Sequence, residues 1–267
     1  MNRTILITGS TDGIGKLAVI KLAKDGHQVY LHGRSSEKLQ RVIEEVKVAS
    51  KNEKIKGFVA DLSDLDAVRQ MAKAVKAEIS QLDVLINNAG VFKSPNALNK
   101  DGLDLRLVVN YLAPYVLTDE LLPVLEASEN ARIINLSSAA QSTVSKGFLT
   151  GTTQVSTQEA YAQSKLALTI WSFDLAKKQS DISVIAVNPG SLLNTRMVQE
   201  AYGRYWSSAD KGANILYDLA VSQQYEGITG KYFDNDKGGF GAAHADAYKE
   251  VLIKQLMETT IAVLEKY

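Results

Sequence analysis

Short apolar runs alternate with longer amphipathic stretches over the first two thirds of the chain. Runs of strand length lie at 4–8, 27–33, 55–61, 83–89, 132–137 and 183–188. Strands that are covered on both faces carry continuous apolar runs, and the segments between these runs are long enough for helices. The pattern predicts an α/β protein in which a Rossmann-like, doubly wound parallel sheet carries helices on both faces.

Residues that start or stop helices support this division. Gly26 is placed to end the first helix, and Ser35 or Ser36 to cap the second. Ser63 and Asp66 have the spacing of a capping box at the start of the third helix. Because no repeat or linker interrupts the alternation, we expect a single domain over residues 1–267.

Three segments depart from the simple alternation. Residues 139–159 are rich in Ser, Thr and Gly, which predicts a loop or small excursion. Residues 192–210 are expected to form either a lid over an apolar substrate or a surface helix pair that packs its aromatic side chains on the body. Residues 245–267 have helical apolar spacing and are expected to pack against the body or a neighbouring subunit. The side chains concerned are Met197, Tyr202, Tyr205 and Trp206 in the second segment and Val251, Leu252, Leu256 and Ile261 in the third.

Composition and charge exclude several classes of protein. Lys plus Arg equals Asp plus Glu at 30 each, so no overall attraction to nucleic acid or anionic membrane is expected. The chain has no cysteine, which removes disulfides, thiolate zinc sites and thiol nucleophiles. No apolar run is long enough to span a bilayer, and the first strand follows Met1 closely. We therefore expect a cytoplasmic protein with no nucleic-acid or membrane partner.

No metal site is expected from the sequence. His27, His32 and His244 are scattered without metal-ligand spacing, so packing or surface roles are expected for them. The stretch 234–241 resembles an acidic calcium loop, but Ala245 stands where that loop needs its final glutamate. A glycine-rich turn is the better interpretation.

The stretch "TILITGSTDGIGK", residues 4–16, reads as strand, tight turn and helix. Gly9, Gly13 and Gly15 allow a tight turn, close approach to a pyrophosphate and close packing of helix on sheet, although their spacing differs by one residue from the usual dinucleotide fingerprint. A P-loop is excluded because Lys16 is followed by Leu17 instead of a magnesium-binding hydroxyl. The turn predicts a dinucleotide site.

The end of the second strand distinguishes the two nicotinamide dinucleotides. An acidic residue there recognises a ribose 2′-hydroxyl, whereas an arginine accommodates a 2′-phosphate. The sequence "LHGRSSEKL" has no acid at the strand end and presents Arg34. This favours NADP(H) over NAD(H), the alternative being that Arg34 is a solvated helix-entry residue.

A tyrosine and a lysine lie four residues apart in "EAYAQSKLAL". On a helix, Tyr161 and Lys165 share one face, where an ammonium can stabilise a phenolate. Such help is needed for proton exchange near neutral pH, because a free tyrosine has a pKa near 10.

Several motifs occur together and in order: "TGSTDGIG", "NNAG" at 87–90, Asn110 in "VVNYLAPY", "IINLSS" at 133–138, "YAQSK" at 161–165 and "NPG" at 188–190. With this combination, the chain resembles the short-chain dehydrogenase/reductase family over residues 3–195. More locally, the stretch around Asn110 and the long interval between Ser138 and Tyr161 resemble the retinol-dehydrogenase-like and WW-domain-oxidoreductase-like branch.

The resemblance implies a nicotinamide cofactor lying across the carboxyl ends of the strands. The side chain of Thr195 stands one residue later than the family's usual Pro-Gly-x-x-x-Thr spacing, so its contact with the carboxamide stays open. The cofactor-binding residues implied, together with Arg34, are Gly9, Ser10, Gly13, Ile14, Gly15, Asp61, Leu62, Asn87, Ala89, Gly90, Tyr161, Lys165, Pro189 and Gly190.

The resemblance also implies a catalytic set of Asn110, Ser138, Tyr161 and Lys165. Ser138 would polarise the reacting carbonyl, with Ser137 as the competing serine, and Tyr161 would act as acid/base. Lys165 would bind the nicotinamide ribose and, with the charge of the oxidised cofactor, lower the Tyr161 pKa. Asn110 would help to hold a proton-relay water.

The expected function is therefore an NADP(H)-dependent oxidoreductase that interconverts a carbonyl and an alcohol by hydride transfer. A non-enzymatic dinucleotide-binding redox sensor or scaffold is the alternative, and an epimerase-type relative fits the glycine spacing less well. The substrate is expected to be small and partly apolar, and a homodimer or homotetramer follows from the resemblance alone.

Overall fold

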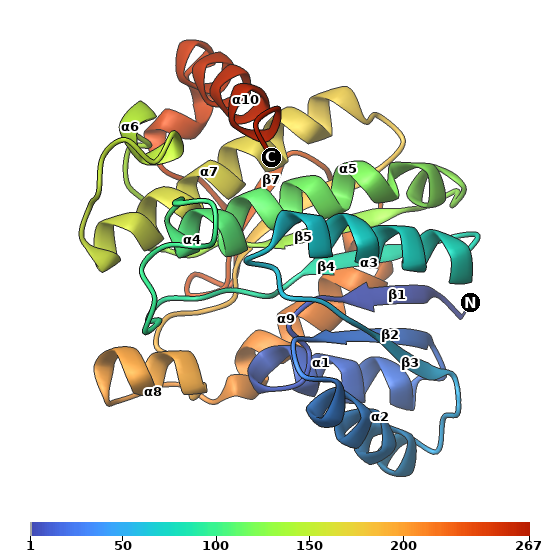
Figure 1. Ribbon diagram of the computed structural model, residues 1–267. Helices are drawn as coiled ribbons and strands as arrows, with labels where there is room; N and C mark the ends of the chain where they lie inside the picture. Colours follow the sequence, from blue (N-terminus) through green and yellow to red (C-terminus); the bar gives the residue numbers. More distant parts are fainter. Residues whose placement is uncertain (1) are drawn as a thin grey trace.

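A computed structural model describes residues 2–267, and its centre is one eight-stranded sheet (Figure 1). The strand order is β3-β2-β1-β4-β5-β6-β7-β8, and every neighbouring pair is parallel except β7 with β8. The strands are β1 (Thr4–Ile7), β2 (Gln28–Gly33), β3 (Ile55–Val59), β4 (Val84–Asn87), β5 (Arg132–Leu136), β6 (Ser183–Asn188), β7 (Lys231–Asp234) and β8 (Gly239–Gly241).

Helices cover both faces of this sheet. One layer holds α1, α2 and α9, and the other holds α3, α5 and α7 with α10 outside it (Figure 1). The helices are α1 (Gly13–Lys24), α2 (Ser36–Ser50), α3 (Leu65–Glu78), α4 (Leu105–Leu107), α5 (Ala113–Glu126), α6 (Lys146–Leu149), α7 (Thr157–Lys178), α8 (Arg196–Tyr202), α9 (Ala209–Val221) and α10 (Glu250–Leu264), with a π-helical turn at Val108–Leu112 and 3₁₀ turns at Gln223–Tyr225 and Ala245–Tyr248.

The predicted doubly wound sheet is confirmed, and its topology fixes where a ligand can bind. The chain moves outward from β1 to β2 and β3, then returns to place β4 on the other side of β1. Such a switch point opens a crevice at the carboxyl ends of the strands. In Figure 1 these ends point to the left, where α4, α6 and α8 lie.

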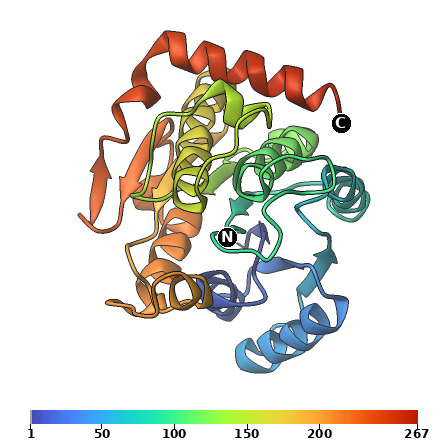
Figure 2. The same ribbon diagram turned by 60° about the vertical axis from the view of Figure 1, so that its left-hand side comes forward.

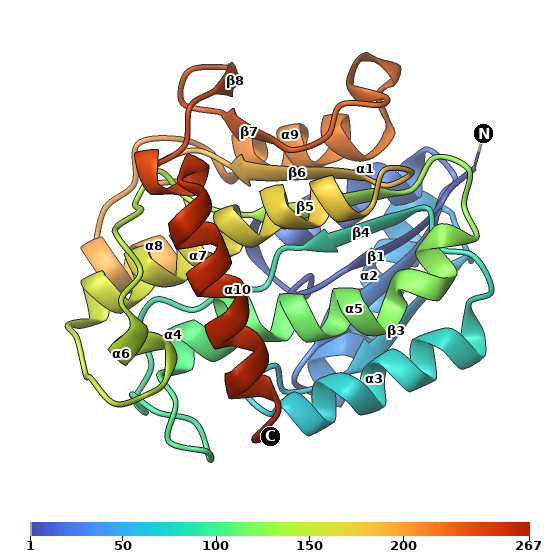
Figure 3. The ribbon, with the colours of Figure 1, turned by 90° about the horizontal axis from the view of Figure 1, so that it is seen from above.

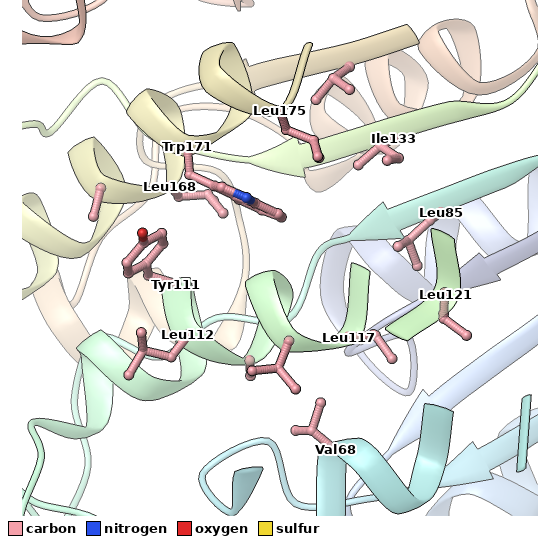
Figure 4. Close-up of a cluster of buried hydrophobic side chains, with 14 of the residues drawn as sticks. Val68, Leu85, Tyr111, Leu112, Leu117, Leu121, Ile133, Leu168, Trp171 and Leu175 are labelled. Carbon is pink, nitrogen blue, oxygen red and sulfur yellow. The ribbon is translucent and has the colours of Figure 1, made fainter. Parts of the chain in front are cut away.

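Two hydrophobic clusters explain why the sheet is stable. Ile5, Ile7 and their neighbours pack against the layer of α1, α2 and α9, while Leu6 and Leu85 pack against the layer of α3, α5 and α7. Figure 4 shows the second cluster, in which Tyr111 and Trp171 fill the space between α5 and α7. Apolar strand residues are thus buried on both faces, as continuous apolar runs require.

Several predicted boundaries can be compared with the helices. Gly26 follows α1 with a φ of 81°, and Ser35 caps α2 through the N–H of Lys38, as predicted. The predicted capping box at Ser63 is wrong, because Asp64 caps α3 and accepts from the N–H of Asp66. The Ser63 hydroxyl instead donates to Asp61, so a nearby carboxylate outcompetes the helix end for it.

The last third of the chain adds elements that the apolar pattern did not reveal. Strand β7 extends the parallel sheet, and β8 pairs with it across the glycine-rich turn that was expected near 234–241. Helix α10 runs across the outer side of α7 (Figures 2 and 3). Leu256 is buried there as predicted, but Val251 is 77% exposed and Ile261 also faces solvent, so packing of these two on the body is wrong. No helix within residues 2–267 combines the length and apolarity needed to cross a membrane.

Candidate active site

The glycine turn between β1 and α1 is held tightly against the start of the "NNAG" segment. Gly9 has a φ of 62°, and a Cβ placed on it would lie 2.7 Å from the Ala89 Cα. A Cβ on Gly15 would lie 2.5 Å from the Asn88 Nδ2. Both positions therefore require glycine for close packing, as predicted from the spacing.

The helix end beyond this turn presents free donors. Asp12 caps α1 by accepting from the Gly13 N–H at 2.8 Å. The N–H groups of Ile14 and Gly15 donate no hydrogen bond to any group within residues 2–267. A Cβ on Gly13 would meet only Thr195, at 3.8 Å, so the turn is open on that side. A helix N-terminus of this kind fits an anionic pyrophosphate.

Asn88, which the sequence analysis did not select, fixes the geometry of the turn. Its Nδ2 donates to the carbonyls of Thr8 at 2.8 Å and Gly9 at 2.9 Å, and its own N–H donates to the Thr8 hydroxyl. The predicted neighbour Asn87 points elsewhere, because its side chain donates to Thr118 and Asn135 inside the fold. Asn87 therefore joins β4 to α5 and β5.

Three other predicted cofactor residues use their side chains for packing. The Ser10 hydroxyl is buried and donates to the Ile7 carbonyl at 2.9 Å. Leu62 lies in the hydrophobic core, and Ile14 packs near Gly212 of α9. These side chains therefore contribute to the fold, although Ile14 stays partly exposed.

The two buried histidines make stability depend on pH. Burial lowers the His32 pKa from 6.5 to about 4 and also lowers the His27 pKa. Between pH 6.5 and 4 the unfolded chain therefore binds protons that the folded protein does not, so stability is full above pH 6.5 and falls as pH falls. We expect His32 alone to cost about 2 kcal/mol between pH 7.5 and 5. Denaturant titrations at both pH values measure this loss, which should shrink in His32→Asn; equal losses in both proteins would contradict it.

Arg34 and Asp61 lie at neighbouring strand ends, after β2 and β3, and both are exposed. Arg34 has no ion pair among the described residues. Asp61 is partly engaged, since one carboxylate oxygen accepts from the N–H and hydroxyl of Ser63. At the β2 end, then, a free guanidinium is available to an anionic ligand.

Helix α7 brings the tyrosine and lysine together. It is buried on nearly all sides, and Tyr161 and Lys165 share one face, with the Lys165 Nζ 5.6 Å from the centre of the Tyr161 ring. Lys165 is buried and its Nζ donates to the Leu136 carbonyl at 2.6 Å. The pair thus stands at the carboxyl end of β5.

The expectation that Lys165, with the charge of the oxidised cofactor, lowers the Tyr161 pKa concerns the cofactor-bound site, and the protein alone shows the effect of burial. Burial raises the Tyr161 pKa, and the contact with Ser138 offsets a part of that rise. Burial also lowers the Lys165 pKa to about 7, because no carboxylate lies beside the ammonium. In the protein alone, burial therefore favours the neutral form of both side chains.

The two serines of "IINLSS" have different surroundings. Ser137 is buried, and its hydroxyl lies 2.6 Å from that of Thr169 on α7. Ser138 is half-buried beside Tyr161, and its hydroxyl accepts only the N–H of Ala140 among the described residues. The geometry favours Ser138 as the serine that faces a ligand.

Asn110 lies within the π-helical turn Val108–Leu112, a type of distortion frequent at functional sites. Its Oδ1 accepts a hydrogen bond from the Val91 N–H, and its Nδ2 donates to the Val91 carbonyl and the Ser164 hydroxyl. A Cβ on Gly90 would lie 3.4 Å from the Asn110 Oδ1 and 3.5 Å from the Lys165 Nζ. The structure thus brings Gly90 and Asn110 next to the lysine.

An aromatic row connects the tyrosine with the segment 192–210. Phe92, which the sequence analysis did not select, packs edge-on against Tyr161 at 5.0 Å and lies 5.7 Å from Tyr202 of α8. Trp206 is 70% exposed and Tyr205 is about half exposed, so neither ring is packed closely on the body, whereas Tyr202, also about half exposed, lies against Phe92. The segment therefore presents exposed aromatic side chains, and Tyr202 connects it through Phe92 with Tyr161.

The loop before that segment is anchored by the turn after β7. Gly190 adopts a φ of 121°, and the Pro189 carbonyl accepts from the Asn235 side chain at 2.9 Å. The carboxylate of Asp236 accepts from the Ser191 N–H. Thr195 uses its hydroxyl to cap α8. These anchors join residues far apart in sequence, which is why no local motif revealed them.

Tyr232 of β7 is a further residue that the sequence did not reveal. Its hydroxyl donates to the Ser138 carbonyl at 3.0 Å, and the Gln141 side chain donates to the same oxygen at 2.9 Å. Both bonds orient the segment that carries Ser138.

Within residues 2–267 no group of three or more His, Asp or Glu side chains could hold a metal ion.

Comparisons with known proteins agree with this arrangement. A family model described as short chain dehydrogenase matches residues 3–205. The chain is 33% identical to retinol dehydrogenase 13 of Mus musculus over 251 residues, which cover 87% of this chain and 75% of that protein. It is 31% identical to polyprenol dehydrogenase of Homo sapiens over 256 residues, or 88% and 78% of the two chains. A short chain dehydrogenase of Shigella flexneri, crystallised with NADP, superposes with a TM-score of 0.72 at 28% identity, covering 88% of this chain and 98% of the other.

Proposed function

The chain belongs to the short-chain dehydrogenase family and is an oxidoreductase of alcohol and carbonyl groups, and from this premise we propose that it is an NADP(H)-dependent enzyme with Tyr161 as its acid/base. One observation carries the proposal. Tyr161 and Lys165 lie on one face of α7, beside Ser138, at the carboxyl ends of the strands and next to the switch point of the sheet.

The residues present fit a nicotinamide dinucleotide. The free N–H groups of Ile14 and Gly15 at the start of α1 suit a pyrophosphate, and Arg34 suits a 2′-phosphate through its planar fork. The NADP bound to the Shigella flexneri protein supports the same choice. When bound, the reduced nicotinamide supplies a hydride to the carbonyl carbon.

The side chains of the site then handle the proton. Ser138 donates a hydrogen bond to the substrate oxygen and polarises the carbonyl, while Tyr161 gives its phenolic proton to that oxygen as the alcohol forms. A phenol that is protonated near neutral pH suits this direction. Lys165 is buried close to the tyrosine ring, where its Nζ would hold ribose hydroxyls of a bound dinucleotide.

The substrate class follows from the surface around Tyr161. Phe92 packs on the tyrosine, and Tyr202 and Trp206 present exposed aromatic area from the segment 192–210, for which we propose the role of a lid. Such a wall favours an alcohol or carbonyl compound with an apolar body. The printed names of the relatives, a retinol dehydrogenase and a polyprenol dehydrogenase, point in the same direction.

The proposal is tested by following cofactor absorbance with NADPH and NADH against small and bulky aldehydes, ketones and quinones. We expect turnover with NADPH to exceed that with NADH, and apolar carbonyls to be reduced with the lower KM. Binding of NADPH without turnover on any carbonyl would favour the alternative of a redox sensor. Failure to bind either dinucleotide would overturn the proposal.

The serine pair gives a first prediction from this mechanism. Ser138→Ala should lower kcat about 100-fold, because it removes the donor that stabilises charge on the substrate oxygen. Ser137→Ala should leave most of the turnover in place and lower the free energy of unfolding by about 1 kcal/mol, since it loses the bond to Thr169. Steady-state kinetics and chemical denaturation measure the two effects. The reverse pattern would show that the roles are exchanged.

Arg34 should determine the preference between the two dinucleotides. In Arg34→Ala we expect the KM for NADPH to rise about tenfold, because a charge-assisted bond to the 2′-phosphate is lost, with no change for NADH. Arg41→Ala is the matched control, as this exposed arginine lies further along α2. An equal rise for both dinucleotides, or the same rise in the control, would argue against this assignment.

A further inference from the structure

One buried histidine lies where three strand ends meet. His32, near the end of β2, is 2% exposed, and its Nδ1 lies 3.1 Å from the N–H nitrogen of Gly9 in the glycine turn. Its Nε2 lies 3.1 Å from the Ala60 carbonyl oxygen, just after β3. Ser10 makes two further bonds to His32: its N–H donates to the His32 carbonyl, and its hydroxyl accepts from the His32 N–H. Four contacts therefore join the turn after β1 to β2 and β3.

Only one protonation state of the ring satisfies both ring contacts. The Gly9 N–H is a donor, so Nδ1 must be unprotonated and accept. The Ala60 carbonyl is an acceptor, so Nε2 must carry the hydrogen. A neutral ring with its hydrogen on Nε2 meets both requirements, whereas the other tautomer and the imidazolium would each set two donors against one another at Gly9.

We propose that His32 is a positioning residue for cofactor binding, which holds the Gly9 turn in its binding conformation and ties it to the end of β3. The inference rests on the proposed dinucleotide function. Gly9 adopts a φ of 62° and lies in close contact with Ala89, and the His32 ring supplies the acceptor for its N–H in this conformation. Asp61 follows Ala60 directly and lies at the exposed strand end. The ring thus sets the spacing between the pyrophosphate turn and the β3 end across which the dinucleotide would lie.

The chain contains a matched control at the opposite end of β2. His27 precedes this strand, and its Nδ1 accepts the N–H of Arg3 at 3.0 Å, which is the same kind of bond to a backbone donor next to β1. This histidine lies away from the carboxyl ends of the strands, where the turn and the catalytic residues are. A purely structural role for such bonds would make the two histidines equivalent in their effect on ligand binding.

The test compares the Kd for NADP⁺ at pH 7.5 in the wild-type protein, His32→Leu, His32→Asn and His27→Leu, with thermal denaturation in parallel. Leucine removes the acceptor for Gly9, whereas the asparagine amide oxygen keeps an acceptor at the distance of Nδ1. We expect binding about tenfold weaker or more in His32→Leu, since the Gly9 N–H loses its acceptor, and largely restored in His32→Asn. His27→Leu should lower the Tm and leave the Kd unchanged.

Two outcomes would overturn the inference while leaving the proposed function intact: a Kd in folded His32→Leu equal to that of the wild type, or an equal loss in His27→Leu. A wild-type protein that binds neither NADP⁺ nor NAD⁺ would overturn both. Should His32→Leu fail to fold, nitrogen-15 NMR of the wild-type histidine rings decides the matter, because the proposed contact requires the hydrogen on Nε2 at pH 7. Detection of the Nδ1 tautomer or of an imidazolium would contradict it.

Discussion

Replacement of Tyr161 by phenylalanine is expected to lower kcat about 1,000-fold while leaving the Kd for NADPH nearly unchanged. The variant lacks the phenolic proton that the substrate oxygen receives, and the other phenol at Ser138, that of Tyr232, already donates to the Ser138 carbonyl. Because the ring remains, its edge contact with Phe92 at 5.0 Å and the wall of the substrate site are preserved. The loss should therefore appear in the chemical step.

Single-turnover kinetics with a saturating carbonyl, together with a fluorescence titration of NADPH, separate the two effects. Tyr115→Phe serves as the control, since Tyr115 packs its ring on Trp171 far along the same layer. That variant should keep wild-type turnover. Turnover in Tyr161→Phe close to that of the wild type would remove Tyr161 from the mechanism, even if NADPH binding were confirmed.

Replacement of Gly9 by alanine should have the largest effect on cofactor binding. The new Cβ would lie 2.7 Å from the Ala89 Cα, which is backbone and cannot rotate away, and the φ of 62° is unfavourable for alanine. We expect a loss of about 3 kcal/mol in the free energy of unfolding, and NADPH binding weakened about 100-fold as the turn and the "NNAG" segment move apart.

A matched glycine separates crowding from backbone strain. Gly227 has a similar φ of 70°, but nothing lies within 4 Å of a Cβ placed on it. Gly227→Ala should therefore cost only about 1 kcal/mol and leave binding unchanged. Chemical denaturation and isothermal titration calorimetry on both variants measure the contrast. Equal costs at the two positions would mean that the close approach to Ala89 contributes nothing.

The predictions from sequence were most accurate for features formed by residues that lie close together in the chain. Tyr161 and Lys165 are four residues apart, so the formation of α7 alone places them on one face. The glycine spacing likewise predicted the turn that Gly9 and Gly15 form, and apolar runs predicted six of the eight strands. Such features depend on the period of a helix or strand, which can be read directly from sequence.

Prediction from the sequence was least successful where a side chain has several possible hydrogen-bond partners in the folded protein. Ser63 has the spacing of a cap, but its hydroxyl binds Asp61 and Asp64 caps α3 instead. His32 was expected in a packing or surface role and is buried, but its bond to the Gly9 N–H could not be predicted because the two residues lie 23 positions apart in the sequence. The predicted lowering of the Tyr161 pKa depends on the charges of Lys165 and of the oxidised cofactor, and in the protein alone burial shifts both pKa values toward the neutral forms.

The sequence by itself determined the alternating α/β architecture, the glycine turn and the Tyr161–Lys165 pair, because each arises from residues close together in the chain. Only the tertiary structure decided that Phe92 covers the tyrosine, that Tyr232 orients Ser138 and that His32 rather than a local residue satisfies Gly9. These contacts form where parallel strands bring distant segments to one edge of the sheet. Their energies depend on burial and on which donor finds which acceptor, and both are set only when the sheet and its two helical layers have assembled.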